Sequence, residues 1–327
     1  MASPNPLDPV AMPGAGTPAS SFEEATYRKV SWRLLPLLLI CYLVAYLDRV
    51  NVGFAKLQMA SALHLSDAVY GLGAGIFFLG YFLFEIPSNL ILHRVGARLW
   101  IARIMVSWGV ISALTMFVTT PAMFYAMRFL LGLAEAGFFP GIILYLTYWY
   151  PAHRRGRMTT WFMTAVALSG VVGGPVSGYI LKTFDGTHGW QGWQWLFLLE
   201  GLPSVVAGIV VFFMLDDRID NAKWLSTEEK QLLARNIGAE DAGKEELPLL
   251  AVLASGRVWL MSFIYLSFVM GLYGVSFWLP TIIKATGVKD AFTIGLLSAI
   301  PFAVAVVAMV LVARSADKRR EIGRAHV

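Results

Sequence analysis

Residues 34–47 read Leu34-Leu-Pro-Leu-Leu-Leu-Ile-Cys-Tyr-Leu-Val-Ala-Tyr-Leu47, without a charged side chain on any face. Residues 299–312 are equally apolar and read Ala299-Ile-Pro-Phe-Ala-Val-Ala-Val-Val-Ala-Met-Val-Leu-Val312. Strands of a membrane barrel would alternate apolar and polar residues over about ten positions, so these stretches exclude a barrel. A run of about 18 or more apolar residues can cross the hydrocarbon core as a helix. The sequence therefore predicts an all-α membrane protein.

The composition agrees with this class. Of the 327 residues, 57% are hydrophobic and 14% are charged, and the mean hydropathy is +0.63, outside the range of soluble globular domains. The formal net charge of +5 lies mostly in loops between apolar runs, so we interpret it as a topology signal and expect no nucleic-acid partner. The single cysteine, Cys41, excludes an intramolecular disulfide.

We expect about eight spans, with a positive-inside bias along the whole chain. Their expected ranges are 31–57, 69–92, 99–118, 121–148, 159–182, 191–215, 257–283 and 292–313. Basic residues gather at alternate span ends, which we therefore place in the cytoplasm together with the N-terminus: Arg28, Lys29, Arg33, Arg94, Arg98, Arg154, Arg155, Arg157, Lys318, Arg319 and Arg320. Aromatic residues at span ends, such as Trp149 and Trp190, are typical of interface belts.

The chain divides into five regions. Residues 1–26 are rich in Pro, Gly, Ala and Ser and are expected to form a disordered cytoplasmic tail. A six-helix N-terminal bundle over 27–215 precedes a cytoplasmic linker over 216–256, in which Ser226-Thr-Glu-Glu229 predicts a helix that continues to about Asn236. A partial C-terminal bundle follows over 257–321. Residues 322–327 resemble translated vector sequence.

Several runs resemble the anion:cation symporter family of the major facilitator superfamily, which contains tartrate, phthalate, galactonate and glucarate permeases. The resemblance covers nearly the whole chain after residue 27, and the runs that carry it are 46–51 (YLDRVN), 85–89 (EIPSN), 128–137 (RFLLGLAEAG), 195–197 (WLF) and 200–203 (EGLP). It implies the major facilitator fold, here a six-helix N-terminal bundle plus the first two helices of the C-terminal bundle. Because that fold has twelve spans, we expect a C-terminally truncated chain that does not transport by itself.

Charged residues inside the first and fourth spans are the candidate site. An ionised side chain near the bilayer centre persists only where it is paired or faces a wet cavity. Arg49 and Arg128, on separate helices, could clamp an anion with bidentate guanidinium contacts, and Glu135 would carry a proton. The resemblance implies substrate contact for both arginines and proton coupling for Asp48 and Glu135, with two tyrosines as cavity hydrogen bonders, Tyr46 and Tyr81.

Simpler interpretations of these charges remain open. Asp48 and Arg49 could be a helix-end pair that reaches outwards, and Arg128 could pair with Glu135, which lies about two turns further along the same helix. Glu85 and Glu200 are also intramembrane carboxyls, and we favour structural pairing for both.

The loop after the second span resembles the superfamily's cytoplasmic gating signature. Asn89, His93, Arg94, Gly96 and Arg98 occupy its positions, with Asn89 replacing a glycine and His93 replacing the acid. Asp317 and Lys318 form the matching piece after the eighth span. A basic turn that obeys the positive-inside rule explains Arg94 and Arg98 equally well.

Three glycines at four-residue spacing, Gly170, Gly174 and Gly178, form a smooth groove on the fifth span. We expect close packing on a neighbouring helix in preference to a transport hinge at Pro175.

The functional prediction is a proton-coupled secondary transporter for a small organic anion, in the inner membrane. The alternative is a carrier for a neutral sugar or drug efflux, in which two cavity arginines would stay uncompensated. An enzyme is not expected, because the histidines are scattered singly without metal-ligand spacing. A channel would need a filter segment, which the sequence lacks. We expect no metal and no cofactor. The expected partners are the anion, protons and the lipid bilayer, and carriers of this kind work as monomers.

Overall fold

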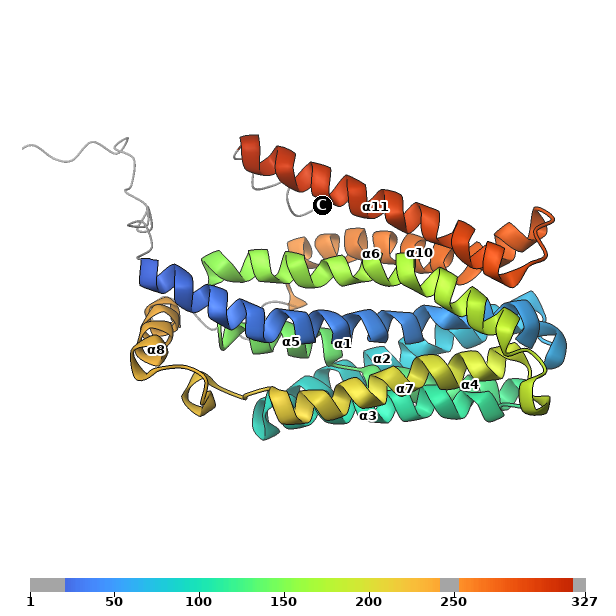
Figure 1. Cartoon of the computed structure of the whole chain (residues 1–327), viewed down its shortest axis with the longest axis horizontal. Coiled ribbons are helices and arrows are strands. Elements are labelled where there is room, and N and C mark those ends of the chain that lie inside the picture. The colour runs from blue at the N-terminus through green and yellow to red at the C-terminus, as the bar shows by residue number, and fades with distance from the viewer. Residues whose placement is uncertain (1–20, 242–252, 320–327) are drawn as a thin grey trace, which may run out of the picture.

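The computed structural model describes residues 21–241 and 253–319, and its long elements are all α-helices that run side by side (Figure 1). Eight of the described helical stretches are long and apolar enough to span a membrane, which confirms the all-α prediction and the expected span positions. The helices are α1 (Ser21–Ala62), α2 (Asp67–Val95), α3 (Ala97–Leu114), α4 (Pro121–Glu135), α5 (Phe138–Thr147), α6 (Ala152–Thr183), α7 (Gly192–Met214), α8 (Thr227–Asp241), α10 (Gly256–Ala285) and α11 (Ala291–Arg319). Short 3₁₀ turns lie at Thr115–Phe117, Thr187–Gly189 and Ile219–Asn221.

Two boundaries differ from the sequence prediction. The fourth span is divided into α4 and α5, because Ala136 leaves the helical conformation and Gly137 has a positive φ of 84°. The helix α1 begins at Ser21, so residues 21–26 of the expected tail are helical, with Glu23 and Glu24 in the first turn, where acidic residues favour a helix start. Residues 1–20 and the expected non-native tail at 322–327 lie outside the described residues.

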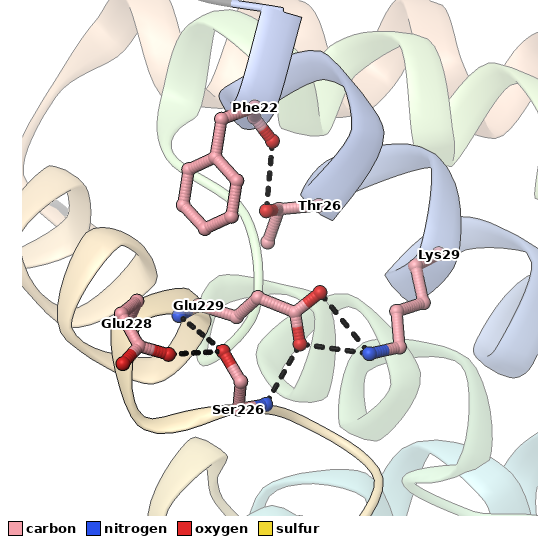
Figure 2. A network of polar contacts seen from close by, with 6 residues as sticks. All are labelled: Phe22, Thr26, Lys29, Ser226, Glu228 and Glu229. Carbon is pink, nitrogen blue, oxygen red and sulfur yellow. Dashed lines mark hydrogen bonds and ion pairs between the residues drawn. The ribbon is translucent and has the colours of Figure 1, made fainter.

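The linker helix α8 packs against the start of α1 (Figure 2). Ser226 and Glu229 form a capping box, in which the Glu229 backbone N–H donates to Ser226 Oγ over 3.2 Å and the Ser226 N–H donates to Glu229 Oε2 over 2.8 Å. The same Glu229 carboxylate forms an ion pair with Lys29 of α1 at 2.8 Å. The helix start predicted from the sequence is therefore confirmed, and one residue both caps α8 and joins it to the bundle.

Glycines set the closest helix crossings in the first bundle. Gly109 of α3 and Gly201 of α7 face each other so closely that a Cβ on either one would lie 2.8 Å from the other's carbonyl oxygen. Gly132 of α4 faces the Phe77 carbonyl of α2 even more tightly. These approaches bring polar groups on different helices within reach of one another.

The last two helices contact the first bundle from one end as far as its middle, where Arg49 of α1 bonds Tyr273 of α10. Figure 1 shows α11 beside α6 at the end far from the start of α1, and then diverging from it. At the contact, a Cβ on Gly174 or Gly178 would lie 2.5 Å from the carbonyl oxygen of Gly295 or Ala291, respectively. The predicted close packing of the fifth-span glycines is therefore confirmed.

Polar contacts hold the same end together. Lys182 of α6 forms an ion pair with Asp290, which precedes α11, at 2.8 Å. The ammonium of Lys182, together with hydrogen bonds from Thr293, lowers the pKa of Asp290 from 3.8 to about 2. Lys284 of α10 donates to the Leu57 carbonyl of α1 over 2.9 Å. This end of the molecule is closed, whereas the other ends of α10 and α11 lie apart from the bundle.

Candidate functional site

The middle of α1 contributes a buried arginine to the interface between the two groups of helices. Arg49 is 8% exposed, and its guanidinium forms an ion pair with Glu135 of α4. It also donates a hydrogen bond to the Tyr273 hydroxyl of α10 over 2.5 Å. The guanidinium carbon lies 5.2 Å from the centre of the Tyr81 ring, close enough for a cation–π contact. Arg49 therefore joins α1 to three other helices, α2, α4 and α10.

Glu135 occupies the last turn of α4, immediately before the break in the fourth span. It is 1% exposed. Gly137 permits the break because its φ is positive, and because a Cβ there would clash with Ser88 of α2. Glu135 pairs with Arg49 of another helix, so the open interpretation of an intrahelical pair with Arg128 is wrong. The break was missed from the sequence, although the dipeptide Ala136-Gly137 offered a signal.

Arg128 is a buried charge of α4 that makes no hydrogen bond to a described residue. It is 1% exposed, and its three guanidinium nitrogens have no hydrogen-bond partner among the described residues. Its guanidinium lies over the Phe77 ring, with 4.9 Å between the guanidinium carbon and the ring centre. Arg49 lies 5.5 Å from the same ring centre. One aromatic ring therefore contacts both arginines, and the clamp of an anion between them stays a prediction.

Phe77 reaches this position because α2 and α4 approach closely at Gly132. Sequence reasoning missed Phe77, since an apolar residue in an apolar span gives no signal. It also missed Tyr273, which stacks on the predicted Tyr46 with 6.2 Å between ring centres. Of the two predicted tyrosines, Tyr81 lies against Arg49, whereas Tyr46 joins the site through Tyr273.

Asp48 points away from these arginines into the packing between α1, α3 and α7. Its carboxylate accepts hydrogen bonds from Trp108 Nε1 at 2.9 Å, Ser112 Oγ at 2.7 Å and Ser204 Oγ at 2.6 Å. Asn51 Nδ2 lies 3.5 Å from the same carboxylate. The open interpretation of an outward-reaching charge pair is therefore wrong, because both Asp48 and Arg49 are buried and bonded inside the bundle.

The two further intramembrane carboxyls, Glu200 and Glu85, differ in their contacts. Glu200 of α7 accepts a hydrogen bond from Ser177 of α6 at 2.6 Å, as structural pairing predicts. Glu85 is half-buried on α2 and forms no ion pair with a described residue, so its pairing stays a prediction.

The gating signature lies on the surface at the α2–α3 turn. Gly96 has a φ of 94°, and a Cβ there would lie 2.7 Å from Oδ1 of Asp217, which accepts a hydrogen bond from the Arg98 backbone N–H over 2.8 Å. His93 and Arg94 are exposed, and Asn89 donates to the Glu85 carbonyl of its own helix. An acid from beyond α7 thus occupies this turn. Asp317 and Lys318 belong to α11, but their side chains lie outside those described.

This geometry suits an anion better than a cation or a metal. Two guanidinium groups lie against one aromatic ring, and one of them makes no hydrogen bond to a described residue. No group of three or more His, Cys, Asp or Glu side chains suited to a metal occurs among the described residues. A buried arginine without a hydrogen-bond partner is a typical binding group for a carboxylate.

Comparison with known proteins identifies the family. The family model of the major facilitator superfamily matches residues 38–326. The chain belongs to the major facilitator superfamily. It is thus a multi-pass membrane protein of a transporter superfamily and not an enzyme, and it acts on a small molecule.

Several superfamily members are similar over most of the chain. The "Putative metabolite transport protein NicT" of Pseudomonas putida is 53% identical over 91% of this chain and 69% of that protein. A "Putative tartrate transporter" of Agrobacterium vitis is 50% identical over 92% of this chain and 70% of its own length. The "Quinolone resistance transporter" of Acinetobacter baumannii is 44% identical over 91% of this chain and 69% of its own length. These relatives agree with the resemblance to the anion:cation symporters.

The fold also matches a solved superfamily structure. A bacterial homolog of the human lysosomal transporter Spinster, in an inward-facing and unoccupied conformation, superposes with a TM-score of 0.67 at 19% identity. The match covers 89% of this chain and 63% of that chain, so this chain spans less than two thirds of that transporter's length.

Proposed function

We propose that the protein carries a small organic anion across the inner membrane by alternating access, coupled to protons. The observation that carries the proposal is Arg128, a buried guanidinium without a partner beside a second guanidinium that is already paired. A dicarboxylate, sugar acid or aromatic acid would supply the missing charge. The relatives named as tartrate transporters support this substrate class.

The anion would bind Arg128 first and then compete with Glu135 for Arg49. Both arginines lie against Phe77, and we propose that one carboxylate contacts both of them. A released Glu135 would be left as a buried carboxylate without its cation, a state that is costly unless it takes up a proton. Anion binding and proton binding would thus favour each other, as symport requires.

The arrangement of the helices supports alternating access. The closed end holds α10 and α11 against α1 and α6. The positive-inside rule favours the cytoplasm for the opposite end and for the N-terminus. The structure would then represent a state that is open to the cytoplasm. We expect the carrier to act as a monomer.

Drug export is the second candidate, favoured by the relative named as a quinolone resistance transporter. A neutral substrate would leave Arg128 uncompensated in a medium of low dielectric constant, which disfavours it. An exported compound that carries a carboxylate would use the same site.

Replacing Arg128 tests the anion site in the protein that carries this sequence. Losing a charge-assisted contact in a desolvated site costs about 2–5 kcal/mol, so Arg128→Ala should weaken anion binding at least about 30-fold. Arg128→Lys should also bind poorly, because an ammonium keeps the charge but loses the bidentate fork. Arg103→Ala is the matched control, since Arg103 lies over Trp100 on α3, away from the site, and should bind normally.

Binding is measured by calorimetry with tartrate, galactonate, glucarate and phthalate, each compared with a neutral analogue of the same size. The proposal is wrong if no acid binds more tightly than its neutral analogue. It is equally wrong if Arg128→Ala binds the acids as the parent does.

A further inference from the structure

A buried lysine lies at the closed end of the molecule, between the first bundle and α10. Lys56 is on α1, about two turns beyond Arg49 towards the closed end, and it is 5% exposed. Its Nζ lies 3.5 Å from the ring centre of Trp278 on α10 and 4.6 Å from that of Tyr70 on α2. An ammonium within about 6 Å of a ring centre makes a cation–π contact, which is strongest with tryptophan. Lys56 therefore contacts both groups of helices through aromatic rings.

One carboxylate also reaches Lys56, but it comes from the first bundle. Asp67, in the first turn of α2, lies 2.8 Å from Lys56 Nζ. Its side chain is 79% exposed, so water screens the ion pair. The pair is close but poorly aligned, since Lys56 Nζ forms no hydrogen bond to a described residue. Because Lys56 and Asp67 both belong to the first bundle, their ion pair cannot hold α10 in place.

The two rings around Lys56 meet only while α10 lies against the first bundle. Tyr70 and Trp278 pack edge to face, with 5.5 Å between ring centres. The Tyr70 hydroxyl donates to the Phe277 carbonyl of α10 over 3.1 Å. Gly53 of α1 permits this approach, because a Cβ there would lie 2.9 Å from the same carbonyl oxygen. Movement of α10 away from α1 and α2 would therefore take Trp278 from Lys56.

The other charged contacts across the closed end are exposed. Lys284 of α10, which bonds the Leu57 carbonyl, lies at the surface. The paired side chains of Lys182 and Asp290 are 57% and 38% exposed. Exposed ion pairs contribute little to stability, whereas a desolvated cation–π contact contributes more. The contact between Lys56 and Trp278 should therefore hold α10 more firmly than these contacts do.

We infer that Lys56 locks α10 against the first bundle through Trp278, and so sets how much of the resting protein is closed at this end. The inference rests on the alternating access proposed above, but it involves neither Arg128 nor the anion nor a proton. Lys56 would be a positioning residue, because it determines which end of the molecule opens without contacting the substrate.

Distances between spin labels in lipid nanodiscs without anion test the lock. The labels are placed on Ser61 of α1 and Thr286 after α10, which are both exposed at the closed end, in a Cys41→Ala background. The parent should give one short distance. Lys56→Met keeps the apolar stem without the charge, and Trp278→Leu removes the ring. Each should raise the ratio of open to closed molecules at least about tenfold and add a longer distance.

Three control variants separate the cation–π contact from other causes. Trp259→Leu, at the opposite end of α10, should keep the parent distance, because Trp259 is 63% exposed and lies away from Lys56. Asp67→Asn removes the carboxylate and leaves both rings, so it should keep the short distance. Lys56→Arg should also keep it, since a guanidinium makes the same kind of contact with a ring.

A short distance that persists in both Lys56→Met and Trp278→Leu would overturn the inference. A longer distance in Asp67→Asn with an unchanged one in Trp278→Leu would overturn it too, by assigning the closure to the ion pair. Trp278→Leu decides alone if Lys56→Met does not fold, because Trp278 is only half-buried.

A second pair of labels distinguishes the lock from the proposed transport function. His153 at the start of α6 and Arg257 at the start of α10 are both exposed at the opposite end. In Lys56→Met, their distance should shorten as the closed end opens. A longer distance at the closed end without this shortening would confirm the lock and contradict alternating access, whereas failure of the anion site would alter neither distance.

Discussion

Replacing Glu135 by glutamine should separate anion binding from its dependence on protons. Glutamine has the size of the protonated carboxyl but cannot hold Arg49 as an ion pair. In the parent at alkaline pH, an anion must displace Glu135 from Arg49, and close buried charge pairs are worth at least about 1.5 kcal/mol. Since 1.4 kcal/mol corresponds to tenfold in affinity, Glu135→Gln should bind the anion about tenfold more tightly at alkaline pH.

Three measurements on Glu135→Gln check this expectation. Calorimetry across pH should show an anion affinity that no longer falls as the pH rises. Uphill uptake driven by a pH gradient should disappear, because no proton can leave after the anion. Counterflow, in which loaded carriers exchange internal for external anion, should persist. Full gradient-driven accumulation in Glu135→Gln would refute the reasoning and make Glu135 a structural partner of Arg49.

Two further predictions concern the packing. Gly132→Ala should lower the free energy of unfolding by about 1–3 kcal/mol in thermal unfolding, because the added Cβ would clash with the Phe77 carbonyl. Gly75→Ala is the control and should not lower it, because an added Cβ there meets nothing within 4 Å. Equal melting temperatures of the two variants would contradict the α2–α4 contact. Because its pKa is lowered, Asp290 contributes to stability above pH 3.8, and this contribution is lost as the pH falls towards 2. Spin labels at the ends of α6 and α11 should report one short distance at neutral pH in the parent. The same labels should report a broadened distance distribution in Asp290→Asn, which lacks the ion pair with Lys182. An unchanged distance in Asp290→Asn would show that the glycine contacts alone close this end.

The apolar periodicity and the loop charges were enough to predict the spans, because a bilayer demands long apolar helices and leaves few alternatives. The helix start at Ser226 was also predictable, since capping depends on residues three apart. The division of the fourth span was not predicted, because one Ala136-Gly137 pair is a weak signal in an apolar run and the close approach of Ser88 to Gly137 comes from another helix.

The charged residues of the candidate site could be located in the sequence, but their partners could not. Adjacent residues on α1 point about 100° apart, and only the packing of α3, α4 and α7 decides that Arg49 meets Glu135 while Asp48 meets Ser112 and Ser204. Phe77 and Tyr273 gave no signal, since aromatic residues in apolar spans are common. Long-range partners require tertiary structure, which local sequence does not encode.

The uncompensated charge of Arg128 has a consequence for the movement of the empty carrier between the two sides of the membrane. A carrier that moved its empty site between the two sides of the membrane would have to enclose an uncompensated guanidinium, which raises the barrier to that step. The loaded carrier encloses a neutral assembly and meets no such barrier. The same charge that recognises the substrate would therefore suppress movement of the empty carrier. Removing this charge should weaken anion binding and also lower the barrier to movement of the empty site.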